Sequence, residues 1–121
     1  MNYFILPGLL GTFELSTERI LIEISESTGI SIEKIASKKR NKEIVNARIV
    51  YSYLAKKYTD KSLSAIGKKI NRDHSTVLHQ IREAEKFLEQ PNDYLSRLIN
   101  KFELKMWPYK KSKVDTVKKI G

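Results

Sequence analysis

The sequence contains no cysteine, which excludes disulfide bonds, thiolate metal sites and thiol nucleophiles. Its five glycines form no G-x-x-x-x-G-K-[ST] phosphate loop, because Gly67-Lys68 lacks the glycine-rich segment that precedes the lysine in that motif. The two histidines, His74 and His79, do not have the H-E-x-x-H spacing and lie on different faces of a helix. A Ser75–His79 pair has no obvious orienting acid or oxyanion loop. We therefore expect no enzyme activity, metal, cofactor or nucleotide.

Long apolar runs are also missing. The N-terminal MNYFILPGLLGTF has no Lys or Arg, and Pro7-Gly8 interrupts it, so it makes a poor secretory signal. No segment approaches the length that spans a bilayer. We expect a cytoplasmic, bacterial or phage protein with no membrane contact, in which residues 1–15 form an arm packed on the domain or on a partner.

Acidic residues become scarce after residue 37. Residues 1–37 contain five acidic and two basic side chains, whereas the remainder contains nine acidic and 21 basic ones. The net charge is +9 and the isoelectric point is about 9.7. This polarised charge favours an acidic partner, nucleic acid first and an anionic membrane second, although a basic protein with no such partner stays possible.

Apolar residues recur at helical spacing through most of the chain, so we predict an all-α, compact helical bundle in one domain, residues 16–106, followed by a basic tail, residues 107–121. Residues of the cap type precede four of the helices: Ser16-Thr17, Ser31, Ser62 and Asp73. Gly29 is placed to end the first helix, and Pro91-Asn92 to separate the last two. Ile32 and Tyr94 are counted among the apolar positions. The predicted helices are residues 17–28, 32–36, 44–58, 62–70, 74–89 and 93–106.

Residues 62–88 have the pattern of a helix-turn-helix, in which Asn71-Arg72-Asp73 forms the turn. Such motifs place the first residues of the second helix against base edges in the major groove. Short donors and acceptors occupy that tip, and cations precede it for phosphates. The pattern favours DNA binding, and a plain helical corner is the alternative. The tip is Asp73, His74, Ser75 and Thr76; the preceding cations are Lys68, Lys69 and Arg72.

Three further positions have open interpretations. His79 is either a partly buried histidine or a DNA contact. The basic segment 38–42, which contains Arg40, is either solvated charge or a contact to phosphates or to a minor groove. Gly67 inside a helix indicates close packing against a neighbouring helix.

The stretch SLSAIGKKINRDHSTVLHQIREAEKFL resembles the C-terminal, origin-binding domain of the DnaA family of bacterial replication initiators. RDHSTVLH, residues 72–79, is the core of the resemblance, which extends back to about Glu18 and forward to about Phe102. It implies a DnaA domain IV-like (Trp-repressor-like) fold that binds double-stranded DNA site-specifically, in replication initiation or its regulation.

The resemblance also implies roles for particular residues. Asp73, His74, Ser75 and Thr76 would read the major groove, with Arg72 as a neighbouring contact. Arg40 would enter the adjacent minor groove, and Arg48 would contact the backbone or a base. Lysines 38, 39, 42, 68 and 69 would neutralise phosphates.

The chain departs from the family pattern in two places. Asn71 stands where the family often has two glycines, and Ala47 and Ile49 replace a frequent proline and glutamine beside Arg48. The family's ATPase module is also not seen, so the chain resembles either a free-standing version, encoded by a phage or mobile element, or a domain of a divergent replication protein, and we expect it not to melt an origin by itself.

Two alternative functions stay open. One is a protein-interaction module of a replication or regulatory complex, with Trp107, Tyr109 and the N-terminal arm as its contact surface. The other is non-specific coating of nucleic acid by the basic tail. We expect double-stranded DNA as the partner, in the nucleoid, with replication proteins as further candidates.

Overall fold

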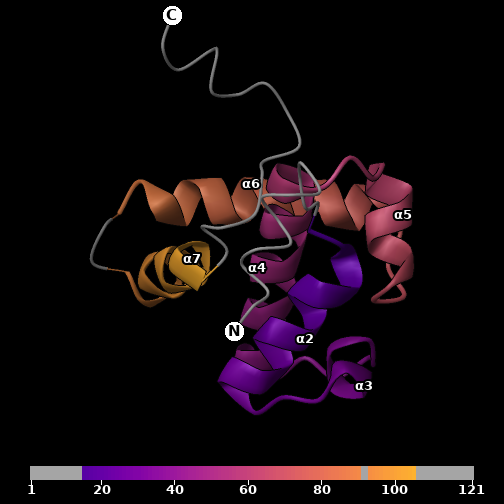
Figure 1. The fold of residues 1–121 in the computed structure, drawn as a ribbon, viewed down its shortest axis with the longest axis horizontal. Helices are drawn as coiled ribbons and strands as arrows, with labels where there is room; N and C mark the ends of the chain where they lie inside the picture. The colour runs from indigo at the N-terminus through magenta and orange to yellow at the C-terminus, as the bar shows by residue number, and fades with distance from the viewer. Residues whose placement is uncertain (1–14, 91–92, 106–121) are drawn as a thin grey trace, which may run out of the picture.

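The computed structural model describes residues 15–90 and 93–105 (Figure 1). The described residues contain helices and no strand, which confirms the predicted all-α class. Residues 1–14, 91–92 and 106–121, and with them most of the predicted arm, the Pro91-Asn92 turn and the predicted contact residues Trp107 and Tyr109, lie outside the described residues. The helices are α2 (Thr17–Thr28), α3 (Ile32–Ile35), α4 (Lys42–Tyr58), α5 (Leu63–Lys68), α6 (His74–Leu88) and α7 (Tyr94–Lys105).

The helix starts follow local cap chemistry, as predicted. The side chains of Ser16, Ser31, Ser62 and Asp73 each accept a hydrogen bond from the backbone N–H three residues later. Gly29 ends α2 in the left-handed conformation, with φ of 78°.

Two boundaries differ from the prediction by two residues. Helix α4 begins at Lys42 rather than at residue 44, because its first residues are exposed and charged and therefore add nothing to an apolar pattern. Helix α5 ends at Lys68 rather than at residue 70, because the N–H groups of Ile70 and Arg72 both turn back to donate to the carbonyl of Gly67. The basic segment is thus shorter than expected, and the turn before α6 is longer.

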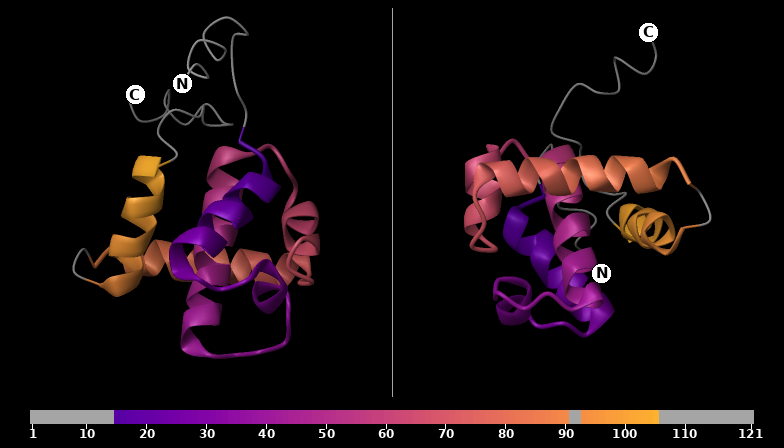
Figure 2. Two further views of the ribbon diagram at one scale, coloured as in Figure 1. Left: turned by 60° about the horizontal axis from the view of Figure 1, so that its bottom comes forward. Right: turned by 180° about the vertical axis from the view of Figure 1, so that it is seen from behind.

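Helix α4 is the centre of the molecule and contacts each of the other five helices of the described region (Figures 1 and 2). Tyr51 of α4 is fully buried and donates a hydrogen bond from its hydroxyl to the carbonyl of Ile66, 2.8 Å away. Burial raises the pKa of this phenol well above its usual value. The other large, fully buried side chains are Ile20, Ile24, Ile35, Val50, Leu54, Ile66, Ile70, Val77, Ile99 and Phe102.

Two residues counted as apolar positions are not in the core. Ile32 is 37% exposed, because α3 is a short turn at the edge of the molecule and its other apolar residue, Ile35, is the one buried. Tyr94, at the start of α7, is 58% exposed. None of the described helices is long and apolar enough to cross a membrane.

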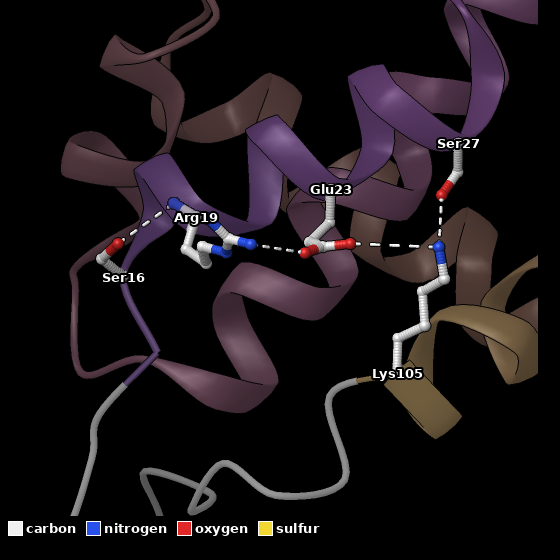
Figure 3. A network of polar contacts seen from close by, with 5 residues as sticks. All are labelled: Ser16, Arg19, Glu23, Ser27 and Lys105. Carbon is white, nitrogen blue, oxygen red and sulfur yellow. Dashed lines mark hydrogen bonds and ion pairs between the residues drawn. The ribbon is translucent and has the colours of Figure 1, made fainter. Parts of the chain in front are cut away.

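Helix α7 lies beside α6 and α4 and is also joined to α2 at its C-terminal end (Figure 2). Lys105 donates to the hydroxyl of Ser27 at 2.9 Å and lies 4.0 Å from Glu23, whose other oxygen pairs with Arg19 (Figure 3). On the α4 side, Lys57 donates to Glu103 at 2.5 Å. These contacts fix α7 relative to both helices.

Candidate nucleic-acid interface

The turn between α5 and α6 depends on a glycine. A Cβ at Gly67 would lie 2.2 Å from the carbonyl oxygen of Arg72 and 3.0 Å from a methyl group of Val77 in α6. The predicted close packing is therefore present, but the nearest neighbour is the backbone of the turn rather than the next helix. Asn71 takes the left-handed conformation, with φ of 58°, which asparagine tolerates better than most residues. This residue reverses the chain before α6.

The first turn of α6 is uncovered. Asp73, His74 and Ser75 are exposed, and Thr76 is half-buried. Asp73 accepts a hydrogen bond from the backbone N–H of Thr76 at 2.9 Å, and this bond lowers the pKa of the Asp73 carboxyl. The tip therefore presents a carboxylate, an imidazole and hydroxyl groups to solvent.

A groove of about 600 Å³ runs between this tip and the basic segment. Arg40 and Lys38 line one side, Val45 and Ile49 of α4 lie between, and α6 forms the other side. Of the tip residues, Thr76 lines this groove together with Arg40, whereas Asp73, His74 and Ser75 do not line it. The groove is lined by Lys38, Arg40, Val45, Arg48, Ile49, Arg72, Thr76, His79, Gln80 and Glu83.

Hydrogen bonds connect the two sides of this groove. Arg48 and Arg72 each donate to the carbonyl oxygen of Ser37, both at 2.8 Å. The side-chain amide of Asn71 donates to the carbonyl of Ala36 at 3.1 Å. The segment that leads to Arg40 is therefore bound directly to the turn that precedes α6, and Figure 2 (left) shows α3 beside this turn.

Arg48 lies inside the protein, in contrast to the predicted direct contact with DNA. It is 4% exposed, and its Nε donates to the carbonyl of Ile35 at 2.6 Å in addition to the bond to Ser37. Burial lowers the pKa of Arg48, and the charges of Arg72 and Arg40 lower it further. Its hydrogen bonds go to backbone carbonyl groups at the end of α3 and in the segment that follows it.

The two lysines of the helix-turn-helix differ in their surroundings. Lys68 is exposed. Lys69 forms a hydrogen-bonded ion pair with Glu18 of α2, and this pairing lowers the pKa of the Glu18 carboxyl. Part of the charge predicted for phosphate binding is therefore balanced within the chain.

His79 and Gln80 line the groove one turn further along α6. The His79 side chain is 73% exposed and lies 3.8 Å from Glu83, so the alternative of a partly buried histidine is wrong. Gln80 is buried and accepts a hydrogen bond from Ser52 of α4 at 2.6 Å. The sequence analysis did not predict the hydrogen bond between Ser52 and Gln80. Both residues are polar and lie at inward positions of their helices, and this pattern could have indicated that they pair.

The described residues contain no group of three or more His, Asp or Glu side chains that is arranged to hold a metal ion. The groove instead offers guanidinium, imidazole, hydroxyl and carboxylate groups on a surface held rigid from beneath. These groups suit hydrogen bonding to a polar, anionic partner.

Comparison with known proteins identifies relatives of this chain. The family described as "Bacterial dnaA protein helix-turn-helix" matches residues 17–83. A protein called "Chromosomal replication initiator protein DnaA" from Thermodesulfovibrio yellowstonii is 40% identical over 87 residues, 71% of this chain and 20% of that protein. The protein of the same name from Streptococcus agalactiae is 40% identical over 77 residues, 63% of this chain and 17% of that protein.

A third relative of that name, from Anaplasma marginale, is 43% identical over 68 residues, 55% of this chain and 14% of that protein. The chain spans about a fifth of the length of the first of these relatives and less of the others. The family match includes the whole turn, the basic segment and all but the end of α6. The chain belongs to the bacterial DnaA helix-turn-helix family and corresponds to the C-terminal domain of DnaA.

Proposed function

We propose that this chain binds double-stranded DNA site-specifically, with the first turn of α6 in the major groove and the segment around Arg40 in the adjacent minor groove. The observation that carries the proposal is the groove that Arg40 shares with Thr76, the last residue of the tip, while Asp73, His74 and Ser75 are exposed directly before Thr76. A DNA duplex presents a major and a minor groove side by side, so a protein that reads both needs two elements at a fixed separation.

The tip supplies the chemistry for base reading. His74, Ser75 and Thr76 offer donors and acceptors of short reach, and the carboxylate of Asp73 is an acceptor suited to the amino group of cytosine or adenine. One oxygen of Asp73 already accepts from the backbone of Thr76. The side chain is therefore held in one orientation before DNA arrives.

The flanks supply the charge for phosphate binding. Lys38, Lys39, Lys42 and Lys68 are exposed, and Lys38 lines the groove. In the minor groove, the negative potential attracts arginine, which suits the exposed Arg40. Affinity should therefore fall steeply with salt through release of counterions.

Arg72 and Arg48 take positioning roles in this proposal. Their guanidinium groups both donate hydrogen bonds to the carbonyl oxygen of Ser37, and these bonds hold the basic segment against the turn. Arg72 also donates to the carbonyls of Ile70 and Asn71, at 3.0 and 3.1 Å. The charge of Arg72 still lies at the groove, where it adds to the attraction for DNA.

The relatives carry the name of a chromosomal replication initiator, so we assign the binding to replication initiation or its regulation, with replication proteins as further partners. The matched region is the helix-turn-helix, and the proposed function is binding rather than catalysis.

Selection of bound duplexes from a random pool tests the proposal. We expect an enriched site, and we expect His74→Ala and Ser75→Ala to relax base preference at one or two positions, with a loss of about 1–3 kcal/mol for the selected site. Lys56→Ala, an exposed change on α4 that lines neither groove, is the matched control. Unchanged base preference in both tip variants would show that α6 does not read the major groove.

Removal of residues 108–121 separates this function from non-specific coating by the basic tail. Base preference should survive the truncation, since every residue assigned to reading lies between residues 38 and 79. Loss of all binding in the truncated chain would favour the coating interpretation.

A further inference from the structure

We propose a second binding site on this domain, a groove that takes an acidic protein segment bearing an aromatic or aliphatic side chain. The groove has a volume of about 790 Å³ and lies between the end of α2, the N-terminal half of α4 and α7. It goes beyond DNA binding, because none of the residues proposed to contact DNA apart from Lys39 lines it.

The two grooves lie on opposite sides of α4. Ile44 and Ala47 line this second groove, whereas Val45, Arg48 and Ile49 line the first. Since successive residues of an α-helix are about 100° apart, these two sets project from different faces of the helix. An occupant of the second groove therefore leaves the proposed DNA-binding face open, with the exception of Lys39, which lines the second groove.

The floor and rim of the groove are partly apolar. Ile44 and Ala47 of α4 are buried at its base, and Leu98 of α7 is half-buried beside them. Tyr94 stands at the rim with 58% of its surface exposed. Exposed tyrosine beside aliphatic side chains is typical of the centre of protein–protein contacts, where one inserted side chain contributes most of the affinity.

The groove is mainly positively charged, and this charge indicates which kind of segment it binds. Lys34 and Lys39 lie on one wall, Arg97 and Lys101 lie on the other, and Glu43 is the one acidic residue among the lining positions. Four cations against one carboxylate favour an acidic segment. The same charge disfavours the chain's own residues 106–121, which contain five lysines and one aspartate.

A protein segment fits these features better than a second piece of nucleic acid. Aliphatic side chains at the base of a groove offer no hydrogen bonds to base edges, but they receive an apolar side chain with release of water. The α7 wall is held in place by the contacts of Lys105 with Ser27 and Glu23, so the groove exists before an occupant arrives (Figure 3).

Selection from a phage-displayed library of random peptides, without DNA, tests the site. We expect enriched sequences rich in Asp and Glu that also carry Phe, Tyr, Trp or Leu. A synthetic peptide of the enriched sequence should move the NMR signals of Tyr94, Leu98 and Lys101, and should leave the signals of His74 and Ser75 unmoved.

Charge reversal provides the matched comparison. The double variant Lys34→Glu, Lys101→Glu changes two exposed side chains and should weaken the peptide by about tenfold or more. Lys56→Glu with Lys61→Glu makes the same change of net charge at exposed positions outside both grooves, and should leave peptide affinity within about twofold. Tyr94→Ala should weaken the peptide without changing the far-UV circular dichroism.

Several outcomes would overturn the site. These are the enrichment of no sequence or of basic sequences, equal loss in both double variants, and a peptide footprint on the tip of α6. A short DNA duplex that shifts the groove signals as strongly as those of the tip would assign the groove to nucleic acid. Concentration-dependent shifts of the same signals without peptide would assign it to a second copy, and a large gain in peptide affinity on deleting residues 1–14 would assign it to that arm. If DNA selection failed while acidic peptides bound, only the proposed DNA function would be lost.

Discussion

Arg72 donates a hydrogen bond from Nη2 to the carbonyl oxygen of Ser37, 2.8 Å away and 35 residues earlier in the chain. The same oxygen accepts from Arg48. One carbonyl group thus joins the turn before α6, the end of α3 and the inner face of α4. The two elements proposed to read neighbouring DNA grooves are held at one separation by this junction.

Arg72→Lys should disrupt the junction while keeping the charge. A lysine ammonium cannot reproduce the forked guanidinium that donates to Ser37, Ile70 and Asn71. We expect affinity for the selected site to fall by about 1–3 kcal/mol, with weaker base preference at major- and minor-groove positions alike and an unchanged salt dependence. Arg82→Lys, an exposed change on α6, is the control. Loss at major-groove positions alone would mean that the junction does not position Arg40.

Lys68→Ala should weaken binding to all duplexes equally. In the proposed complex the exposed ammonium neutralises a phosphate, so its removal should reduce the slope of log affinity against log salt by about 1. Lys69→Ala should have a smaller effect, because Glu18 already pairs with that lysine. Titrations of selected and scrambled duplexes at several salt concentrations measure both, and a change in base preference would contradict the phosphate role.

Glu18→Gln should strengthen binding to every duplex. The substitution removes a negative charge beside the helix-turn-helix and releases Lys69. Exposed ion pairs contribute up to about 1 kcal/mol, so a gain of a few-fold in affinity is expected at low salt and should disappear at high salt. Glu26→Gln, exposed on the same helix, controls for the change in net charge. Equal gains in the two variants would show that Lys69 has no special part.

Gly67→Ala should destabilise the domain despite the better helix propensity of alanine. The added Cβ would meet the Arg72 carbonyl at 2.2 Å, and that oxygen belongs to backbone that cannot rotate away. Overpacking of this kind is destabilising by about 1–3 kcal/mol. Urea unfolding measures the loss, with Ser64→Ala, exposed on the same helix, as the comparison. A more stable Gly67→Ala variant would show that the turn relaxes.

Asp73→Asn should reduce stability above about pH 4 and have less effect in acid. The folded-state pKa of Asp73 is lowered by its bond to the Thr76 N–H, so its contribution is present above the unfolded pKa and is lost as pH falls through the folded one. Asparagine still caps the helix, so the change isolates the charge, whereas Asp73→Ala should also lose the cap and so reduce stability at both pH values. Unfolding curves at pH 7 and pH 3 measure the difference; equal losses at both would contradict an ionised cap.

The helices and their starts could be predicted because their causes are local. Ser31 and Ser62 each cap a backbone N–H only three residues later, and Gly29 ends α2 through its own left-handed conformation. The early start of α4 was missed because Lys42 is exposed, and a pattern of apolar residues does not register charged first turns. The exposure of Tyr94 depends on how α7 lies against α4 and α6, which no short window of sequence contains.

The candidate site divides in the same way. The exposure of the α6 tip could be predicted from the sequence, because it follows from a local cap and from the polar residues beside it. The burial of Arg48 could not be predicted. Its acceptors are the carbonyl groups of Ile35 and Ser37, and backbone oxygens are the same at every position of a sequence. The resemblance to a family gave Arg48 a role without giving its surroundings.

The hydrogen bond between Ser52 and Gln80 has a consequence for protein engineering. It joins α4 to α6 in the interior, just as the hydrogen bonds to residues 35–37 join the basic segment to α4 and to the turn before α6. All residues that form these hydrogen bonds lie between residues 35 and 80. The geometry of the surface is thus encoded in one short, uninterrupted stretch. Chimaeras that exchange this stretch as a block should inherit the donor's target preference, whereas exchange of α6 alone would separate Gln80 from Ser52 and lose it.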